Sequence, residues 1–179
     1  MLRHLAVLLA IGLTGCGTVL STTYGAATDE RSLGAQVDDT AIVARIKKGF
    51  LDANAGALGL TVFCHQRLVV LAGVVEDPRM GERAAAIARA VEGVRQVETY
   101  FVPRQPSRVS DFGIATKIKA KVVGDLDLRI SQVDLDVFAG QAVLAGVVDR
   151  REKIDEIVRL VRSVDGVVAV KSFLQVKAQ

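Results

Sequence analysis

The chain has 179 residues, of which 50% are hydrophobic, and a formal net charge of +3. This apolar content is enough for a packed core, and the length allows one medium-sized domain or two small ones. A dedicated nucleic-acid binder would carry a clustered basic excess, so we exclude that class.

The first 15 residues have the layout of a secretory signal peptide. A short basic segment, Met1–His4, precedes an almost unbroken run of apolar residues that ends at Leu13. That run is too short to cross a bilayer, which takes about 20 apolar residues. We therefore expect residues 1–15 to be a leader that is removed.

Cys16 directly follows this leader. The segment Leu13-Thr14-Gly15-Cys16 resembles the lipobox of bacterial lipoproteins, in which the cysteine thiol carries a diacylglycerol and the new amino terminus is acylated. The alternative is an ordinary secretory leader with a chance cysteine. The resemblance implies a permanent anchor, because each buried CH₂ contributes about 0.8 kcal/mol. Since Gly17 is not an aspartate, the resemblance also favours delivery to the outer membrane over retention in the inner membrane. We expect the anchored protein at the periplasmic face, although Gly17 itself does not indicate which leaflet it occupies.

Residues 16–37 comprise the lipidation site and a segment rich in Ser, Thr, Ala and Gly, without sustained periodicity. We interpret this segment as a flexible tether between the lipid and the folded part of the chain.

From Asp38 onward the sequence repeats itself with an offset of 72 or 73 residues. The recurring blocks are Asp39–Lys47 with Asp111–Lys119, Leu71–Val75 with Leu144–Val148, and Glu92–Val94 with Asp165–Val167. A near-constant offset over three separate blocks predicts two copies of one small domain. We assign domain 1 to residues 38–103, a linker to residues 104–110 and domain 2 to residues 111–179. Because the linker is short, we expect the domains to pack together.

Each copy is expected to begin with a helix, because apolar residues recur at every fourth position. The rows on one helical face are Ile42, Ile46 and Phe50 in domain 1 and Ile114, Ile118 and Val122 in domain 2. Asp39 and Asp111 stand where an N-cap or a first-turn acid is favoured. The helix of domain 2 is expected to reach about Val123.

Two strands joined by a tight turn follow in each copy. Domain 1 offers residues 60–64 and 68–71, and domain 2 offers residues 133–137 and 142–144. The segment 133–137 alternates strictly between apolar and acidic residues, as a half-buried strand does.

A second helix and a last strand complete each copy, so the order is α-β-β-α-β, twice. The apolar stripe of the second helix comprises Ala84, Ile87, Ala88 and Val91 in domain 1 and Ile157, Leu160, Val161 and Val164 in domain 2. The last strands are expected at residues 97–102 and 168–176.

Four glycines at matching positions are interpreted as structural rather than functional; they are Gly73, Gly146, Gly93 and Gly166. A glycine inside a strand marks a bulge or a close approach by another part of the chain, which applies to the first two. The other two stand where the end of a helix favours a positive φ.

This doubled unit, with Leu-Ala-Gly-Val-Val in the second strand and an acid-Gly-Val segment after the second helix, resembles the BON domain. Two such domains behind a lipobox resemble the dual BON-domain outer-membrane lipoproteins. The resemblance covers the chain from about Asp38. It implies an α+β fold in which each domain has a small mixed three-stranded sheet with two helices on one face. It also implies that the first helix of domain 2 binds anionic phospholipid.

The helix expected at residues 111–123 has an outward face suited to a lipid surface. At 100° per residue, this face and its edges hold Thr116, Lys117, Lys119, Ala120, Lys121 and Val123. Lysine stems lie along apolar groups while their ammonium groups meet phosphate, and each lysine contributes about 1 kcal/mol near an anionic surface. The strip has no aromatic residue. The alternative is a solvated face with routine lysines, since Arg45, Lys47 and Lys48 give domain 1 a similar charge.

Cys64 and His65 are neighbours, and such a pair could indicate a thiol nucleophile or half of a metal site. Adjacent strand residues point to opposite faces, so the two side chains would not converge. We expect Cys64 to be a lone buried thiol and His65 an ordinary residue of the hairpin turn. With no second ligand cluster, cofactor motif or paired catalytic groups, we expect no enzyme activity, metal or cofactor.

Together these features favour a non-enzymatic outer-membrane lipoprotein that binds anionic phospholipid through domain 2 and supports envelope integrity. The alternative is an adaptor that binds an envelope protein or the cell-wall machinery. Binding to vesicles with and without anionic lipid distinguishes these two classes.

Overall fold

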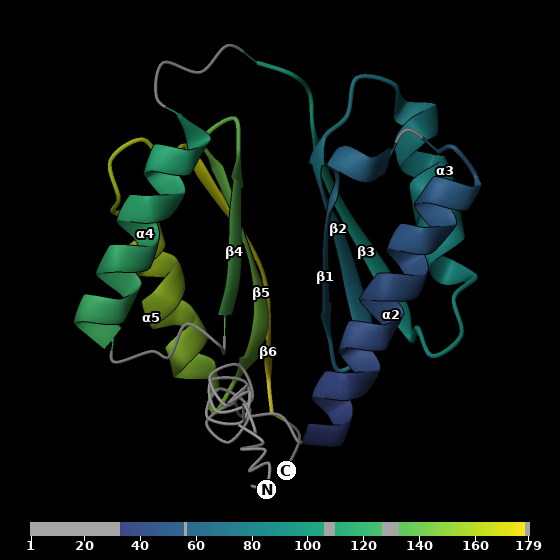
Figure 1. The fold of residues 1–179 in the computed structure, drawn as a ribbon. Coiled ribbons are helices and arrows are strands. Elements are labelled where there is room, and N and C mark those ends of the chain that lie inside the picture. Colours follow the sequence, from purple (N-terminus) through teal and green to yellow (C-terminus); the bar gives the residue numbers. More distant parts are fainter. Residues whose placement is uncertain (1–32, 56, 106–109, 127–132, 178–179) are drawn as a thin grey trace, which may run out of the picture.

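The structure is a computed structural model that describes residues 33–55, 57–105, 110–126 and 133–177 (Figure 1). The expected signal peptide, Cys16 and most of the expected tether lie outside these residues. Within the described ranges, no helix is long and apolar enough to span a membrane.

The described elements form two α-β-β-α-β units, which confirms the predicted order. Domain 1 comprises α2 (Leu33–Asp52), the short 3-10 helix η1 (Ala57–Gly59), β1 (Thr61–His65), β2 (Leu68–Val74), α3 (Pro78–Arg89) and β3 (Gln96–Val102). Domain 2 comprises α4 (Asp111–Leu126), β4 (Val133–Phe138), β5 (Gln141–Val148), α5 (Arg151–Arg162) and β6 (Ala169–Val176).

Helix α2 begins earlier than the sequence pattern indicates. Residues 33–37 are helical, so interpreting them as part of a flexible tether is wrong. The first turns of α2 carry no core face, since Val37 is 68% exposed and the buried row starts only at Ile42. Apolar periodicity therefore could not reveal them.

Each sheet has three strands and mixed direction, as expected. In domain 1, β1 pairs antiparallel with β2, and β2 pairs parallel with β3. Domain 2 repeats this arrangement in the order β4-β5-β6. Both hairpins turn through two residues with positive φ, Gln66-Arg67 and Ala139-Gly140, as in type I′ turns, whose twist matches that of the paired strands.

Two helices cover one face of each sheet and enclose a separate core in each domain. The core of domain 1 includes Ile42, Ile46, Phe50, Val69 and Leu71, and that of domain 2 includes Ile114, Ile118, Leu144, Ile157 and Val161. Full burial of one such side chain stabilises the fold by about 1.5–3 kcal/mol. The predicted rows of the first helices are thus confirmed as core faces. In the second helices the prediction is wrong in part, because Val91 and Val164 lie beyond the ends of α3 (Pro78–Arg89) and α5 (Arg151–Arg162) and Leu160 is only partly buried.

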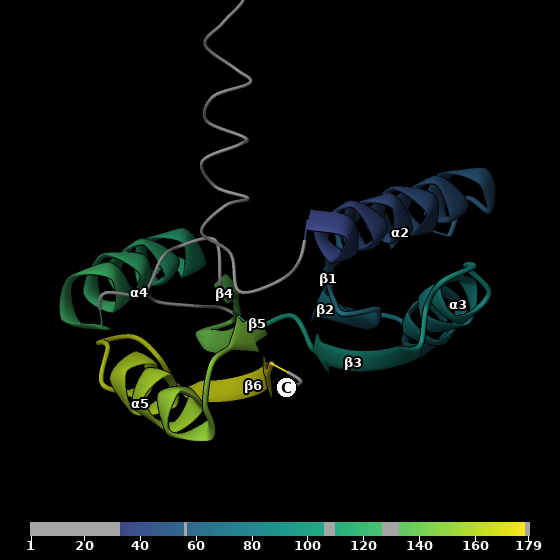
Figure 2. The ribbon, with the colours of Figure 1, turned by 90° about the horizontal axis from the view of Figure 1, so that it is seen from below.

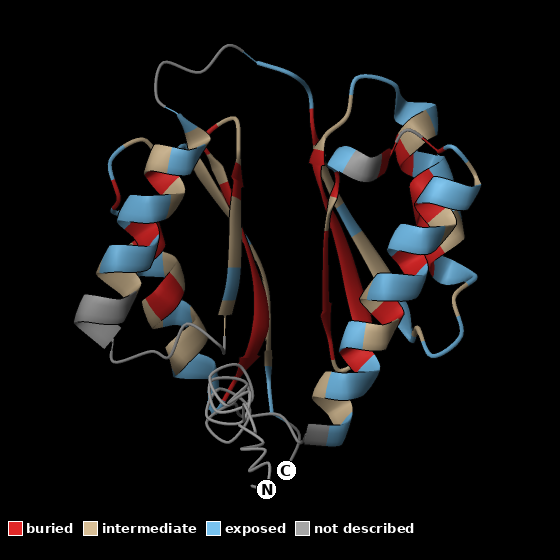
Figure 3. Cartoon of the chain, viewed as in Figure 1, coloured by how far each residue is buried: buried red, intermediate tan, exposed pale blue. Residues whose placement is uncertain are grey.

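The other face of each sheet packs against the opposite domain, which gives four layers in the order α-β-β-α (Figures 2 and 3). The buried contact cluster comprises Phe63, Leu68, Val70 and Ala72 of domain 1 with Val143 and Ala145 of domain 2. Hydrogen bonds border this cluster: the Thr61 hydroxyl donates to Asp136 at 2.6 Å, and the Tyr100 hydroxyl donates to Gln141 at 2.6 Å. The expectation that the domains pack together is confirmed.

Gly73 stands where the chain approaches itself closely. A Cβ built on it would lie 2.7 Å from Cδ2 of Leu60, and its φ is +157°. Gly146, at the matching place in β5, has a φ of +155°. Gly93 and Gly166 have φ values of +92° and +95°, each three residues beyond a helix C-cap rather than directly after the helix.

Candidate functional site

Helix α4 is held against domain 2 by its buried face and by its first residue. Ile114 and Ile118 are at most 1% exposed. The Asp111 carboxylate accepts hydrogen bonds from the backbone N–H groups of Ala139 and Gly140, both at 2.8 Å. This fixes the start of α4 to the β4–β5 turn and sets which side of the helix faces outward.

The outward side of α4 carries the residues that the sequence analysis selected. Thr116, Lys119 and Ala120 are exposed, Lys121 is half-buried, and the Val123 side chain lies outside the described part of the structure. The Thr116 hydroxyl donates to the Phe112 carbonyl at 2.8 Å, so it is satisfied within the helix.

The three lysines of α4 are not equivalent. Lys117 Nζ lies 3.2 Å from a carboxylate oxygen of Asp165, in an exposed ion pair. Lys119 and Lys121 form no ion pair or hydrogen bond within the described ranges. A paired lysine offers less net charge to an anionic surface. The attraction of α4 to such a surface therefore depends mainly on Lys119 and Lys121.

Phe112 is the residue that sequence reasoning missed. It lies four residues before Thr116, therefore on the same helical face, and it is 81% exposed. The statement that the strip has no aromatic residue is wrong. Extending the four-residue spacing backwards from Thr116 would have found Phe112, and the matching position in domain 1 holds Thr40.

Helix α2 offers a contrasting surface in domain 1. Lys48 pairs with Asp52, and the Arg45 guanidinium reaches the Glu92 carbonyl at 3.5 Å. Val37 and Leu51 are 68% and 60% exposed. The exposed face of α2 therefore combines aliphatic side chains with partly neutralised charge and has no aromatic ring.

Cys64 and His65 point to opposite faces of the sheet, as expected. The Cys64 thiol lies buried 3.3 Å from a carboxylate oxygen of Asp39, on the helix side. His65 faces domain 2, where its Nε2 lies 2.8 Å from a carboxylate oxygen of Asp134. His65 is only 4% exposed, so its interpretation as an ordinary turn residue is wrong. It ends β1 and is buried because the second sheet covers it.

The described residues contain no group of three or more His, Cys, Asp or Glu side chains that could hold a metal ion. The Nδ1 atom of His65 is buried without a hydrogen-bond partner among them. His65 therefore belongs to the contact between the domains rather than to a ligand set.

The model of the BON domain family matches residues 38–102 and 110–178. The chain belongs to the BON domain family. The two matches coincide with the two α-β-β-α-β units, so the prediction of a dual BON-domain protein is confirmed.

Two curated proteins show the same relationship along most of the chain. Osmotically-inducible protein Y of Escherichia coli (strain K12) is 32% identical over 152 residues, which cover 81% of this chain and 76% of that protein. Outer membrane lipoprotein DolP of Haemophilus influenzae is 29% identical over 165 residues, or 84% of each chain. A solved structure of CdsD, a structural protein of the type III secretion system of Chlamydia trachomatis, aligns at 11% identity over 76% of this chain and 92% of that one, with a TM-score of 0.33. That score is too low to carry an inference.

Proposed function

We propose that this BON-domain protein is a non-enzymatic outer-membrane lipoprotein that binds anionic phospholipid through α4 and so supports envelope integrity. In this proposal residues 1–15 are removed as a signal peptide, and Cys16 carries the lipid anchor at the periplasmic face. The likeness to a relative named as an outer membrane lipoprotein supports that location.

The observation that carries the proposal is the outward face of α4. It combines an aromatic ring that is 81% exposed with two lysines that have no partner in the described part of the chain. An aromatic ring can enter the boundary between headgroups and acyl chains while the lysine ammonium groups meet phosphate. The face is small, so its own affinity is weak. A lipid anchor would keep it beside the bilayer at high effective concentration.

Vesicle flotation of the mature chain with Cys16→Ser tests the lipid contact without the anchor. The chain is expected to float with phosphatidylcholine vesicles that contain phosphatidylglycerol and not with phosphatidylcholine alone. Replacing Lys119 and Lys121 with Glu should weaken binding at least about 30-fold, since each lysine contributes about 1 kcal/mol and each Glu adds repulsion. Adding Lys117→Glu should abolish flotation.

Matched variants distinguish vesicle binding through the face of α4 from attraction by the overall positive charge of the protein. Phe112→Thr installs the residue that domain 1 carries at this position and should weaken flotation without changing the net charge. Lys47→Glu with Lys48→Glu changes the charge of α2 by the same amount as the α4 pair and should leave flotation nearly unchanged. Equal losses in the α2 and α4 variants, or no loss in either, would contradict binding through α4. Failure of the Cys16→Ser chain without further substitutions to float with anionic vesicles would favour the adaptor class.

A further inference from the structure

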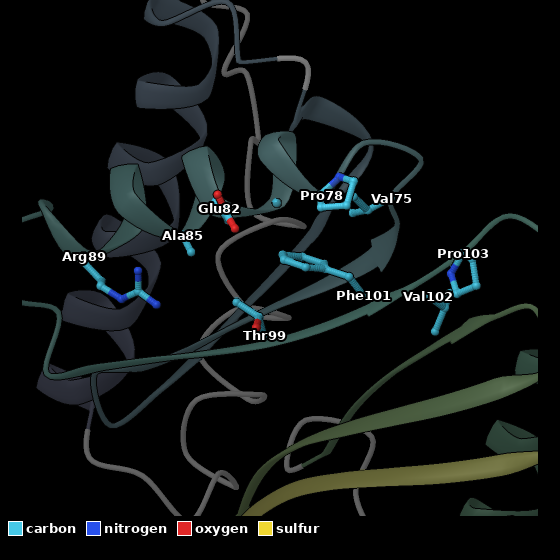
Figure 4. A pocket seen from close by; sticks show the side chains of 10 residues that line it. Val75, Pro78, Glu82, Ala85, Arg89, Thr99, Phe101, Val102 and Pro103 are labelled. Carbon is cyan, nitrogen blue, oxygen red and sulfur yellow. The ribbon is translucent and has the colours of Figure 1, made fainter.

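A groove of about 490 Å³ lies between α3 and β3 of domain 1 (Figure 4). Its walls are mainly apolar and include Phe101 of β3 and Ala85 of α3. Three polar side chains border it: Glu82 and Arg89 from α3, and Thr99 from β3. A volume of this size falls within the range of sites that bind ligands of several hundred daltons.

Domain 2 carries larger side chains at the place that matches this groove. At the offset of 73 residues, Ile154 and Val158 of α5 stand where domain 1 has Gly81 and Ala85. Both larger residues pack against the core of domain 2. A Cβ on Gly81 would lie 2.7 Å from Cε2 of Phe101, so the ring rests directly on the helix backbone. Domain 1 thus has smaller residues than domain 2 at both positions, and the Phe101 ring occupies the space beside Gly81.

The groove runs beside an edge of the sheet that pairs with no further strand among the described residues. Strand β3 is the outer strand in the order β1-β2-β3. The Gln96 N–H and the Val102 carbonyl both bond toward the β2 side of the sheet. Because successive residues of a strand direct their backbone groups to alternate sides, Thr99 and Phe101 direct theirs to the open side. Such unpaired backbone groups are a template for an added strand.

The polar residues at the groove include two opposite charges and have no side-chain partner in the described part of the chain. Glu82, Arg89 and Thr99 form no side-chain hydrogen bond or ion pair within the described ranges. Glu82 and Arg89 are two helical turns apart, or about 10 Å along α3. Side chains four positions apart on one face of an extended peptide are separated by about 13 Å, which flexible charged side chains can match. Glu82 and Arg89 are exposed, so they are accessible to charges of opposite sign on a ligand. A peptide can supply both such charges and backbone groups for the strand edge, whereas an acyl chain can supply neither.

We propose that this groove binds an extended peptide segment of a partner protein, which adds to β3 as a fourth strand. One apolar side chain of the peptide packs on the Phe101 ring beside Ala85. An acidic side chain of the peptide pairs with Arg89, and a basic one pairs with Glu82. This site is separate from α4 and does not depend on phospholipid binding.

The test uses the mature chain with Cys16→Ser and two synthetic peptides capped at both ends. Each peptide is built of Thr and Val around a central Leu, with one Lys and one Glu placed two positions before and after the Leu, in either order, so that all three side chains share one face. Backbone NMR shift perturbation should place one of the two orders along β3 and α3. Ala85→Val, which installs the residue of domain 2, should weaken that peptide at least about 10-fold. Arg89→Glu should abolish its binding and restore binding to a peptide whose Glu is replaced by Lys.

Two controls test whether the effect of Arg89→Glu is specific to the groove. Arg162→Glu alters the matching position of domain 2 and should leave peptide binding unchanged. Vesicle flotation of the Arg89→Glu chain should also be unchanged, which separates this site from the lipid contact. Absence of shifts on β3 with either peptide, or unaltered binding by folded Arg89→Glu protein, would overturn the proposal. Groove shifts with phosphatidylglycerol-containing micelles but with neither peptide would assign the groove to acyl chains and would equally overturn it.

Discussion

At the scale of single residues, one aspartate in each domain joins the first helix to the hairpin turn. Asp39 is 3% exposed, and its carboxylate accepts from the N–H groups of Gln66 and Arg67, both at 2.9 Å. Asp111 makes the matching pair of bonds in domain 2. Asp111 lies in the first turn of α4, as predicted, but Asp39 lies inside α2 and is not an N-cap. The repeated Asp therefore belongs to the turn as much as to the helix.

Asp39→Ala should destabilise domain 1 by about 3 kcal/mol. The substitution leaves two turn N–H groups without their acceptor, and hydrogen bonds to a charged group are worth about 1.5–3 kcal/mol each. Asp39→Asn, which retains one acceptor oxygen, should cost less. Urea unfolding followed by circular dichroism measures both changes. A loss below about 1 kcal/mol for Asp39→Ala would show that the turn does not depend on this carboxylate.

His65 and Phe112 show what sequence reasoning could and could not reveal at this scale. The neighbours of His65 indicated the end of a hairpin, but its burial arises from the sheet of domain 2, where its partner Asp134 is 69 positions away. The pattern of neighbouring residues in the sequence does not show which strands are covered by the other domain. The exposure of Phe112 had a local signal, since it continues the spacing of the outward strip, and it was within reach of sequence reasoning.

At the scale of elements, periodicity predicted the helices and strands well wherever they face a core. The strand cores and the buried rows of the first helices lie where the pattern placed them. The errors fall at the exposed start of α2 and at the ends of α3 and α5, which stop three residues or more before the expected glycines. Element ends depend on caps and loops rather than on apolar spacing.

Gly73→Ala should destabilise domain 1 by about 2 kcal/mol through overpacking between β2 and the segment before β1. The new methyl group would meet Leu60, whose Cα also lies within 3.4 Å of the built Cβ position, so backbone as well as side chain must shift. Thermal unfolding of this variant beside Gly34→Ala, where a Cβ meets nothing within 4 Å, measures the difference. Equal melting temperatures for the two variants would contradict the close approach.

At the scale of the whole molecule, the two sheets exclude water from one another. Val143 and Ala145 of β5 are at most 1% exposed and contact domain 1, while Leu144 between them contacts the α4 and α5 core. The middle strand of domain 2 is therefore buried on both faces. The sequence showed this as a continuous apolar run, yet only the fold identifies the covering surface as the other domain.

Val143→Asp should separate the domains without unfolding them. A carboxylate placed in the apolar contact cannot be solvated while the sheets touch, and the core on the other face of β5 is unchanged. Small-angle scattering should report a larger radius of gyration, and backbone amide spectra should retain dispersed signals from both domains. Val143→Ala is the conservative comparison and should keep the sheets together. An unchanged radius for Val143→Asp would show that the sheet contact is not what holds the domains.

The face-to-face sheets also set the directions in which the helices point. In Figure 2, α4 and α3 occupy opposite corners of the four-layer body. A molecule resting on α4 against a bilayer would turn the α3–β3 groove toward the aqueous side, where a partner chain could reach it. The protein could then bind lipid and a partner peptide at the same time. It would hold the partner protein at a fixed distance from the membrane.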